Sequence, residues 1–327
     1  MNLITPLGVA RVATVLPTVH AVPAAALPGA QSQQKIEVWG YDAKLGKDVL
    51  LRSGAGVDSH DAIANAAYGN MQKVLSYYQN TFHRNSFDGK GSLIKLRVHS
   101  PDAVTGENPA NNAYWMNDEH RIWLGDGDGK MFSPLGNAVD IVGHEFTHGV
   151  IDSSIQETTG YGQEGALQES WADVMATGLD GNWQIGETVY TPGVAGDAVR
   201  DLEHPVYAKM SDLKPWVDEG HKMADVPNHA AFLVANKIGG DAMRKVWYEA
   251  LTKDMKNHSG FADARKATMQ AASRMYGATS AELTAVQQAW DGVGITDTLP
   301  KETITNGMSS AFALQDMAQR LGSLRSR

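Results

Sequence analysis

The sequence predicts an α+β protein with two lobes, a mainly β amino-terminal lobe and a mainly α carboxyl-terminal lobe, joined by one helix. Two observations predict this fold. Runs with the two-residue period of strands are confined to residues 35–155. The rest of the chain has the spacing of amphipathic helices, separated by residues that start and stop helices. We therefore expect a first lobe at 35–155 and a second lobe at 156–295.

The first lobe is expected to contain strands and hairpins, together with one early helix. Apolar residues at strand spacing predict strands at 35–41, 93–98 and 121–124, and residues 61–82 have the period of a helix. Residues 125–129 read Gly-Asp-Gly-Asp-Gly, which resembles a calcium loop in composition. Because the twelve-residue calcium-loop pattern is missing, a tight turn is the better interpretation.

The second lobe is expected to be helical. Residues 165–176 have the period of a helix, and Pro227 opens another run that stops at Gly239 and Gly240. Asp241 is expected to cap the following helix. The segment Thr279-Ser-Ala-Glu282 matches a capping box and predicts a last helix.

The joining helix carries the most informative motif of the chain. Residues 139–151 have the apolar pattern of a buried helix and contain His144-Glu145-Phe-Thr-His148. Positions i and i+4 share one face of a helix, so both imidazoles can meet one tetrahedral zinc ion, with Glu145 near its water. The alternative is a core helix with two hydrogen-bonded histidines.

A catalytic zinc ion needs a third protein ligand, and Glu169 is the candidate. Glu169 and Asp173 are again at i and i+4, here on the helix expected at 165–176. If Glu169 reaches the metal, Asp173 can accept the remaining ring N–H of a ligating histidine, most simply His144. The alternative is a solvated helix face, although no basic residue lies nearby in the sequence to pair with these acids.

The chain resembles the thermolysin-like neutral metalloendopeptidases from about residue 37 to residue 295. Its landmarks follow the family's order: NNAYW at 111–115, GDGDG at 125–129 with Phe132 and Pro134 after it, HEFTH at 144–148, GALQESWADVMA at 165–176, YTPG at 190–193, Asp197 with Arg200, and Pro227 with Asn228. Several unrelated motifs in one order are more specific than any one alone. The resemblance implies the family's two-lobed fold and a zinc-dependent hydrolase of peptide bonds.

The resemblance also implies roles for the motif residues. It makes His144, His148 and Glu169 the zinc ligands and Glu145 the general base. The chemistry is consistent with these roles, because zinc lowers the pKa of bound water towards ~7 and a carboxylate within reach can carry the proton to the leaving amine.

Two further donors are implied for the oxyanion that develops during hydrolysis. Tyr161 and His221 resemble that pair, and His221 lies seven residues before Asn228, as in the family. Tyr161 is the only tyrosine between His148 and Glu169, and a surface tyrosine is the alternative. Asp218 lies three residues upstream of His221 and is expected to orient its ring, unless Asp218 or Glu219 is a plain surface charge.

The resemblance places the peptide substrate in two regions. Asn112 and the carbonyl of Ala113 are expected to hold an extended peptide by its main chain. The side chain after the scissile bond is expected to be a bulky apolar one, in a pocket with walls from Phe132, Ile141 and Val199 and with Arg200 at its base. The alternative is that the three apolar residues belong to the core.

Calcium is the second ion that the resemblance implies, since carboxylate and carbonyl oxygens are its usual ligands. Asp140, Asp180 and Glu187 match the acidic positions of the family's main calcium site. Asn182 and Gln184 stand where other members carry acids, which favours one calcium over two. Thr191 with Asp197 is a second candidate.

Composition excludes several classes of protein. The net charge of −9 argues against nucleic acid as a partner, and no apolar run is long enough to span a membrane. Cysteine is absent, so no disulfide stabilises the fold. The expected partners are peptide or protein substrates, and a monomer is expected.

The two ends have a different character. Residues 1–34 are rich in Ala, Val and Pro, and we interpret them as an arm or a short pro-segment, because Pro6, Pro17 and Pro23 interrupt any signal-like apolar run. Residues 296–327 lie beyond the resemblance, and 309–324 have the pattern of an amphipathic helix. Secretion is expected from the family, with the cytoplasm left open.

The leading hypothesis is a zinc endopeptidase that cleaves on the amino side of bulky apolar residues. An inactive zinc-containing relative that binds peptides or a partner is the main alternative. It is favoured only if the cleft is blocked by the arm at residues 1–34 or by Met223 and Ala224, which replace the Asn and Ser common in the family. A zinc exopeptidase is a third possibility. Glu145 favours catalysis, because a binding protein needs no general base.

Overall fold

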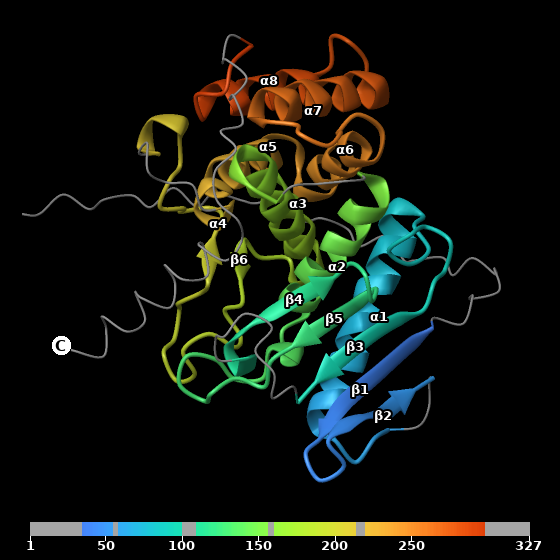
Figure 1. The fold of residues 1–327 in the computed structure, drawn as a ribbon. Helices are drawn as coiled ribbons and strands as arrows, with labels where there is room; N and C mark the ends of the chain where they lie inside the picture. The colour runs from blue at the N-terminus through green and yellow to red at the C-terminus, as the bar shows by residue number, and fades with distance from the viewer. Residues whose placement is uncertain (1–34, 55–57, 100–108, 156–159, 214–219, 298–327) are drawn as a thin grey trace, which may run out of the picture. The chain divides into compact units, whose positions relative to one another are not determined.

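The computed structural model describes residues 35–54, 58–99, 109–155, 160–213 and 220–297. All of these residues belong to one compact unit of the chain. Their strands lie early in the sequence and their helices mostly later (Figure 1), so the predicted two-lobed α+β fold is confirmed. Within the described residues, no helix is long and apolar enough to cross a membrane.

One mixed sheet of five strands forms the core of the first lobe. The strands are β1 (Ile36–Asp42), β2 (Lys47–Ser53), β3 (Ile94–Val98), β4 (Ala113–Met116) and β5 (Arg121–Leu124), in the spatial order β2-β1-β3-β5-β4. The pairs β1–β2 and β4–β5 are antiparallel hairpins, whereas β3 lies parallel to both β1 and β5. As a result, β4 is an end strand of the sheet.

Helix α1 (Ala62–Phe82) packs against this sheet and against α2 (Val139–Ser154). Asp61 caps α1 by accepting a hydrogen bond from the backbone N–H of Ala64 at 2.8 Å. The hydroxyls of Tyr78 on α1 and Thr147 on α2 are 2.7 Å apart. This buried contact fixes α1 against the helix that carries the His-Glu-Phe-Thr-His motif.

Helix α2 also lies close to β4, and Gly149 makes this approach possible. A Cβ atom at Gly149 would lie 2.9 Å from two ring atoms of Trp115 on β4. The Trp115 ring is held in place because its Nε1 donates to Asp152 Oδ2 at 2.7 Å. The motif helix and the end strand therefore have a fixed spacing.

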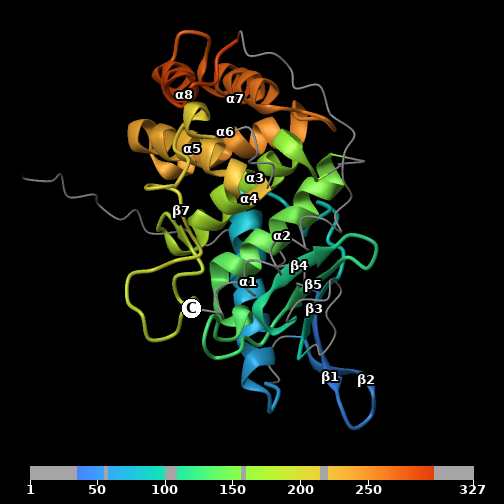
Figure 2. The ribbon, with the colours of Figure 1, turned by 60° about the vertical axis from the view of Figure 1, so that its left-hand side comes forward.

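The second lobe is built around α3 (Gly162–Asp180). This helix packs against α2, α4 (Gly220–Met223), α5 (Asp225–Ile238), α6 (Gly240–Lys253) and α7 (Phe261–Tyr276), and α8 (Ala281–Gly292) packs on α5 and α7. Figure 2 shows α5, α6, α7 and α8 above α2 and α3. Trp171, Trp247 and Trp290 are buried at their centre, and Trp171 Nε1 donates to the Trp247 carbonyl at 3.0 Å.

Short elements complete the described chain. They are the 3₁₀ turns η1 (Pro109–Asn111), η2 (Leu135–Asn137) and η3 (Met210–Asp212), and the two-stranded pair β6 (Gln184–Ile185) and β7 (Arg200–Asp201).

Two predicted helix caps are wrong. Helix α6 already begins at Gly240, so Asp241 lies within its first turn and pairs with Arg244 at 3.1 Å instead of capping the helix. Helix α8 is capped by Ser280, whose Oγ accepts from the Leu283 N–H at 3.1 Å, and Thr279 lies outside the helix. The cap position is taken by Gly239, two residues before Asp241, in α6, and by Ser280, one residue after Thr279, in α8.

Candidate active site

Two adjacent helices bring the predicted zinc ligands together. His144 and His148 lie one turn apart on α2, with their Nε2 atoms 3.1 Å from each other. Glu169 approaches from α3, with Oε2 at 3.2 Å from His144 Nε2 and Oε1 at 3.6 Å from His148 Nε2. One ligand atom from each of the three residues lies within 4.8 Å of the others.

The chemistry of these donors fits a zinc ion. Two imidazoles and one carboxylate are a donor set used by catalytic zinc sites, which leave a fourth position open. Burial lowers the pKa of His148 to about 4, so its imidazole is neutral and has a lone pair to offer. Burial would raise the pKa of Glu169, but the neighbouring histidines hold it well below its usual value and keep the carboxylate charged.

Asp173 lies next to His144, one of the predicted zinc ligands, and is fully buried. Its Oδ1 is 2.8 Å from His144 Nδ1, as expected for an acceptor that orients a ligating imidazole. Arg200 on β7 donates to the same carboxylate from Nε and Nη2 at 2.8 and 2.7 Å. Burial alone would raise the pKa of Asp173, but the charges of Arg200 and His144 lower it.

Glu145 points from the same helix as the histidines and is only 7% exposed. Burial, with a further contribution from the charge of Glu169, raises its pKa to about 7. A carboxyl group with this pKa can both accept and return a proton near neutral pH.

His221 lies on α4, which packs against α3. Its Nε2 is 3.0 Å from Glu169 Oε2, and its side chain is 52% exposed. The charge of Glu169 raises the pKa of His221, which favours the imidazolium form. Its predicted orienting acid, Asp218, lies outside the described residues.

Tyr161 immediately precedes α3 and is 45% exposed. Its carbonyl accepts a hydrogen bond from the Gly165 N–H at 3.0 Å, which forms the first turn of the helix. The backbone of Tyr161 is therefore fixed by the first turn of α3. Its hydroxyl makes no hydrogen bond to His144, His148 or Glu169. Its role as an oxyanion donor stays a prediction.

The predicted substrate edge coincides with the start of the end strand. Asn112 directly precedes β4, and its carbonyl accepts from the Gly125 N–H at 2.9 Å. Ala113 pairs with Leu124 of β5, the strand on the inner side of β4.

The predicted pocket residues form two groups. A Cβ atom at Gly186 would lie 2.8 Å from Val199 Cγ2 and 3.4 Å from Ile141 Cδ1, so these two side chains meet at one point. Phe132 instead contacts Tyr190, with ring centroids 5.3 Å apart. Val199 is 36% exposed, whereas Ile141 and Phe132 are buried. Burial of these two side chains is compatible with a place in the core as well as with the wall of a pocket.

Both predicted calcium sites have their side chains close together. Carboxylate oxygens of Asp140, Asp180 and Glu187 lie within 4.8 Å of one another. Burial, with the charges of Glu187 and Asp180, raises the pKa of Asp140 to about 6, so the cluster favours a cation. At the second site, the Thr191 hydroxyl donates to Asp197.

The sequence interpretation missed the functional contact of one residue in the site. Asn228 on α5 is 1% exposed, and its Nδ2 donates to Asp173 Oδ2 at 2.9 Å. In the sequence, Asn228 served only as a landmark of the family resemblance and as the reference point for His221. A polar residue within the apolar face of a helix was the available signal.

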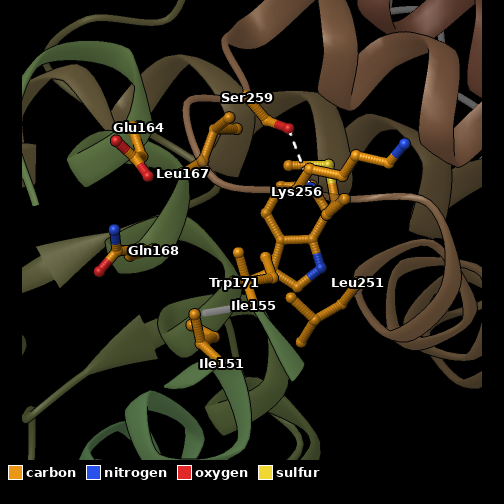
Figure 3. Close-up of a pocket in the computed structure, with 10 residues that line it drawn as sticks. Ile151, Ile155, Glu164, Leu167, Gln168, Trp171, Leu251, Lys256 and Ser259 are labelled. Atoms are coloured by element: carbon orange, nitrogen blue, oxygen red, sulfur yellow. Dashed lines mark hydrogen bonds between the residues drawn. The ribbon is translucent and has the colours of Figure 1, made fainter. Parts of the chain in front are cut away.

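A separate small cavity lies on the other side of α3 (Figure 3). It has a volume of about 20 Å³, and Ile151, Leu167, Trp171 and Leu251 are among the apolar residues that line it. This volume is enough for about one water molecule. The cavity is thus too small to hold a peptide side chain together with its main chain.

Known proteins resemble this chain along most of its length. Residues 26–152 match the family model described as the thermolysin metallopeptidase catalytic domain, and residues 160–295 match the model of its alpha-helical domain. An extracellular elastase of Staphylococcus epidermidis is 35% identical over 283 residues, which cover 83% of this chain and 54% of the relative. The thermostable neutral protease NprT of Geobacillus stearothermophilus is 36% identical over 265 residues, 72% of this chain and 46% of the relative.

Among solved structures, the precursor of protealysin, a metalloproteinase from Serratia proteamaculans, aligns with a TM-score of 0.69 at 28% identity. The alignment covers 85% of this chain and 91% of that chain. The chain spans about half the length of the curated relatives it matches. The two family models match consecutive parts of the chain and together cover most of it, so this chain belongs to the thermolysin metallopeptidase family.

Proposed function

We propose that this protein is a zinc-dependent endopeptidase. The observation that carries the proposal is the convergence of His144, His148 and Glu169, with the buried carboxyl group of Glu145 on the same helix. In this proposal the three residues hold zinc, which when bound supplies a Lewis acid that polarises the scissile carbonyl and acidifies water.

Glu145 is proposed as the general base. Its carboxylate takes a proton from the attacking water and passes it to the nitrogen of the leaving amine. A pKa of about 7 suits both halves of this transfer, because the group is neither a strong acid nor a strong base at neutral pH. Asp173 is proposed to fix the ring of His144, and Arg200 holds the carboxylate of Asp173 in place.

His221 and Tyr161 are proposed to donate hydrogen bonds to the oxyanion that develops on the substrate. His221 is suited to this role because its pKa is raised and its side chain is accessible. Asp218 is proposed to orient it.

The substrate is proposed to bind as an extended chain along Asn112 and Ala113, beside the end strand β4. The side chain after the scissile bond is proposed to meet Val199, Ile141 and Phe132, so cleavage on the amino side of bulky apolar residues is expected. Calcium is proposed at the Asp140 cluster and at Thr191 with Asp197. One relative is named an extracellular elastase, which supports a proposal of secretion.

The proposal is tested by cleavage of a quenched-fluorescent peptide with Leu after the scissile bond. Wild type should cleave it, while Glu145→Gln should lose at least about 100-fold in kcat with its zinc content unchanged. Glu119→Gln changes an exposed acid that pairs with Arg121 and is the matched control. Fragment masses then identify the bond that is cut.

An inactive peptide-binding relative is the alternative, and it would be favoured if Met223 and Ala224 blocked the substrate site. Both residues are buried, so they face the core and not a substrate. A zinc-loaded wild type that binds the peptide without cleaving it would support this alternative over the enzyme.

A further inference from the structure

His99 lies immediately after β3 and is held between two carboxylates. Its Nδ1 is 2.6 Å from Asp126 Oδ2, and its Nε2 is 2.7 Å from Asp61 Oδ2. The His99 backbone N–H also donates to Asp126 Oδ1 at 3.2 Å. One residue thus joins the amino-terminal end of α1, the end of β3 and the turn that follows β5.

The ring is a cation at neutral pH. Only the imidazolium form can donate from both ring nitrogens, and each nitrogen here has a carboxylate partner. The hydrogen bond to Asp126, with the charges of Asp126 and Asp61, raises the pKa of His99 to about 9. The charged groups facing the ring are Asp61 and Asp126, while β1 presents Gly40, whose ideal Cβ position is 3.1 Å from His99 Cδ2.

The backbone at His99 is also unusual. Its φ is 57°, in the left-handed region that non-glycine residues seldom occupy. Such a conformation persists where the surrounding contacts determine it, and it often marks a functional constraint. At His99 this conformation is accompanied by the ring contacts with Asp61 and Asp126.

Asp126 belongs to the turn at residues 125–129, which is bonded to the segment before β4. Gly125 N–H donates to the Asn112 carbonyl at 2.9 Å, and Gly127 N–H donates to the Ala110 carbonyl at 2.6 Å. Asn111 and Asp128 exchange two further hydrogen bonds, both 2.9 Å long. A shift of the turn would therefore move Asn112.

We propose that His99 is a positioning residue for peptide binding: by holding Asp126 against Asp61, it fixes the 125–129 turn and, through this turn, Asn112 at the substrate edge. This role rests on the proposed endopeptidase function and on the proposed contact of the substrate with Asn112. His99 itself does not touch the substrate or the zinc cluster in this proposal.

The variant that tests the role is His99→Asn. Asn tolerates the left-handed backbone but carries no charge and cannot bridge both carboxylates. A matched control is His258→Asn. His258 also has a left-handed φ, of 59°, and lies beside an acid, with Nδ1 at 3.5 Å from Glu164 Oε2, but it belongs to the helical lobe.

Two substrates separate positioning from general damage. A peptide of about eight residues runs along the edge, whereas a blocked dipeptide makes fewer main-chain contacts with it. His99→Asn should raise KM for the long peptide about tenfold, equivalent to about 1.4 kcal/mol. KM for the dipeptide and kcat for both should change by less than about threefold. His258→Asn should resemble wild type with both substrates.

A pH profile gives a second readout. In wild type, KM for the long peptide should rise as the pH passes about 9, because His99 then loses its charge. In His99→Asn, KM should lack this rise. An equal fall of kcat for both substrates with unchanged KM values would overturn the proposal and indicate a purely structural role.

Binding decides the role of His99 even if hydrolysis fails. The labelled long peptide is titrated into zinc-loaded Glu145→Gln with and without His99→Asn, and a tenfold weaker Kd is expected in the double variant. If wild type cleaves nothing, the enzyme proposal fails on that result alone. Equal Kd values, or no binding to either protein, would overturn the positioning role.

Discussion

Asp173 connects three residues of the candidate site that lie on different elements. It accepts hydrogen bonds from Arg200 and Asn228 and lies 2.8 Å from His144 Nδ1. A buried carboxylate with these partners is stable only while they remain, because an unpaired buried charge is strongly unfavourable. The orientation of His144, a proposed zinc ligand, therefore depends on contacts between α2, α3, α5 and β7.

Replacing Asp173 with Asn should weaken zinc binding by about 10- to 100-fold, the usual effect of losing a carboxylate that orients a ligating histidine. The amide also places an N–H towards Arg200 or His144, which repels their donors. Competition with a chromogenic chelator measures the affinity. Asp201→Asn, at a part-exposed acid that contacts Gln184 at 3.3 Å, is the control. An unchanged zinc affinity in Asp173→Asn would refute the orienting role.

At this scale, the sequence predicted contacts that are local in the chain. The spacing of His144 and His148, and of Glu169 and Asp173, follows directly from the turn of a helix. The bond from Arg200 to Asp173 spans 27 residues, so the two acids seemed to lack a basic partner. Likewise, no local pattern could reveal that His99 lies between Asp61 and Asp126.

At the scale of elements, the close contact of α2 with β4 depends on the small size of Gly149. A methyl group there would be forced against the Trp115 ring, which is itself fixed by Asp152. Crowding of this kind is destabilising by about 1–3 kcal/mol.

Gly149→Ala should therefore lower the Tm, although alanine is the better helix former by about 1 kcal/mol. Gly69→Ala on α1 is a matched control, because nothing lies within 4 Å of its ideal Cβ position. We expect its Tm to stay or rise, with a difference between the two variants of roughly 4–8 °C by calorimetry. Equal Tm values would show that the α2–β4 spacing is not tight.

His99 should also make the packing of α1, β3 and the 125–129 turn sensitive to pH. Its folded-state pKa of about 9 lies above the value of ~6.5 for an unfolded chain. The stabilisation is thus fully present below pH ~6.5 and is lost as the pH rises through about 9.

The Tm of wild type should exceed that of His99→Asn by roughly 3–6 °C at pH 6, and the difference should shrink at pH 9.5. Scans at fixed zinc and calcium measure it. His258→Asn should not show this trend. A difference that stays constant with pH would contradict a charged His99 in the folded state.

Element positions were predicted better than element boundaries. The helix at 61–82 and the strand at 121–124 are predicted to within one residue, because a long helical period and a short apolar run are local signals. The cap of α6 is predicted two residues late and that of α8 one residue early, because Gly239 and Ser280 compete with nearby residues that have similar capping ability. The end of α3 at Asp180 was missed, since its pattern continues beyond Ala176.

For the whole molecule, calcium is expected to contribute to stability. Three carboxylates converge at Asp140, Asp180 and Glu187, and burial raises the pKa of Asp140 and of Asp180. Their mutual repulsion is relieved by a cation. With cysteine absent, no disulfide offers the same constraint.

Calcium at about 100 times its Kd should add about 2.7 kcal/mol, or roughly 5–10 °C in Tm. Asp180→Asn should reduce this gain, while Asp212→Asn, at a partly exposed acid in η3, should preserve it. Calorimetry with and without calcium, at constant zinc, measures the gain in Tm for each variant. A Tm independent of calcium in wild type would remove the calcium proposal.

The two-lobed architecture could be predicted from the sequence because strand and helix periods are segregated along the chain. The order of strands could not, since the parallel pairs β1–β3 and β3–β5 join segments that are distant in the sequence. For such long-range features, only the resemblance to a known family implied the fold.

The central claim is that one zinc ion, held by His144, His148 and Glu169, makes this chain an endopeptidase. The most direct measurement titrates zinc into the metal-free protein while hydrolysis of the quenched-fluorescent peptide is followed in the same cuvette. We predict that activity rises linearly and reaches its plateau at one zinc per chain, and that Glu145→Gln binds the same zinc without activity. A protein that is fully loaded with one zinc and still cleaves no peptide would contradict the claim.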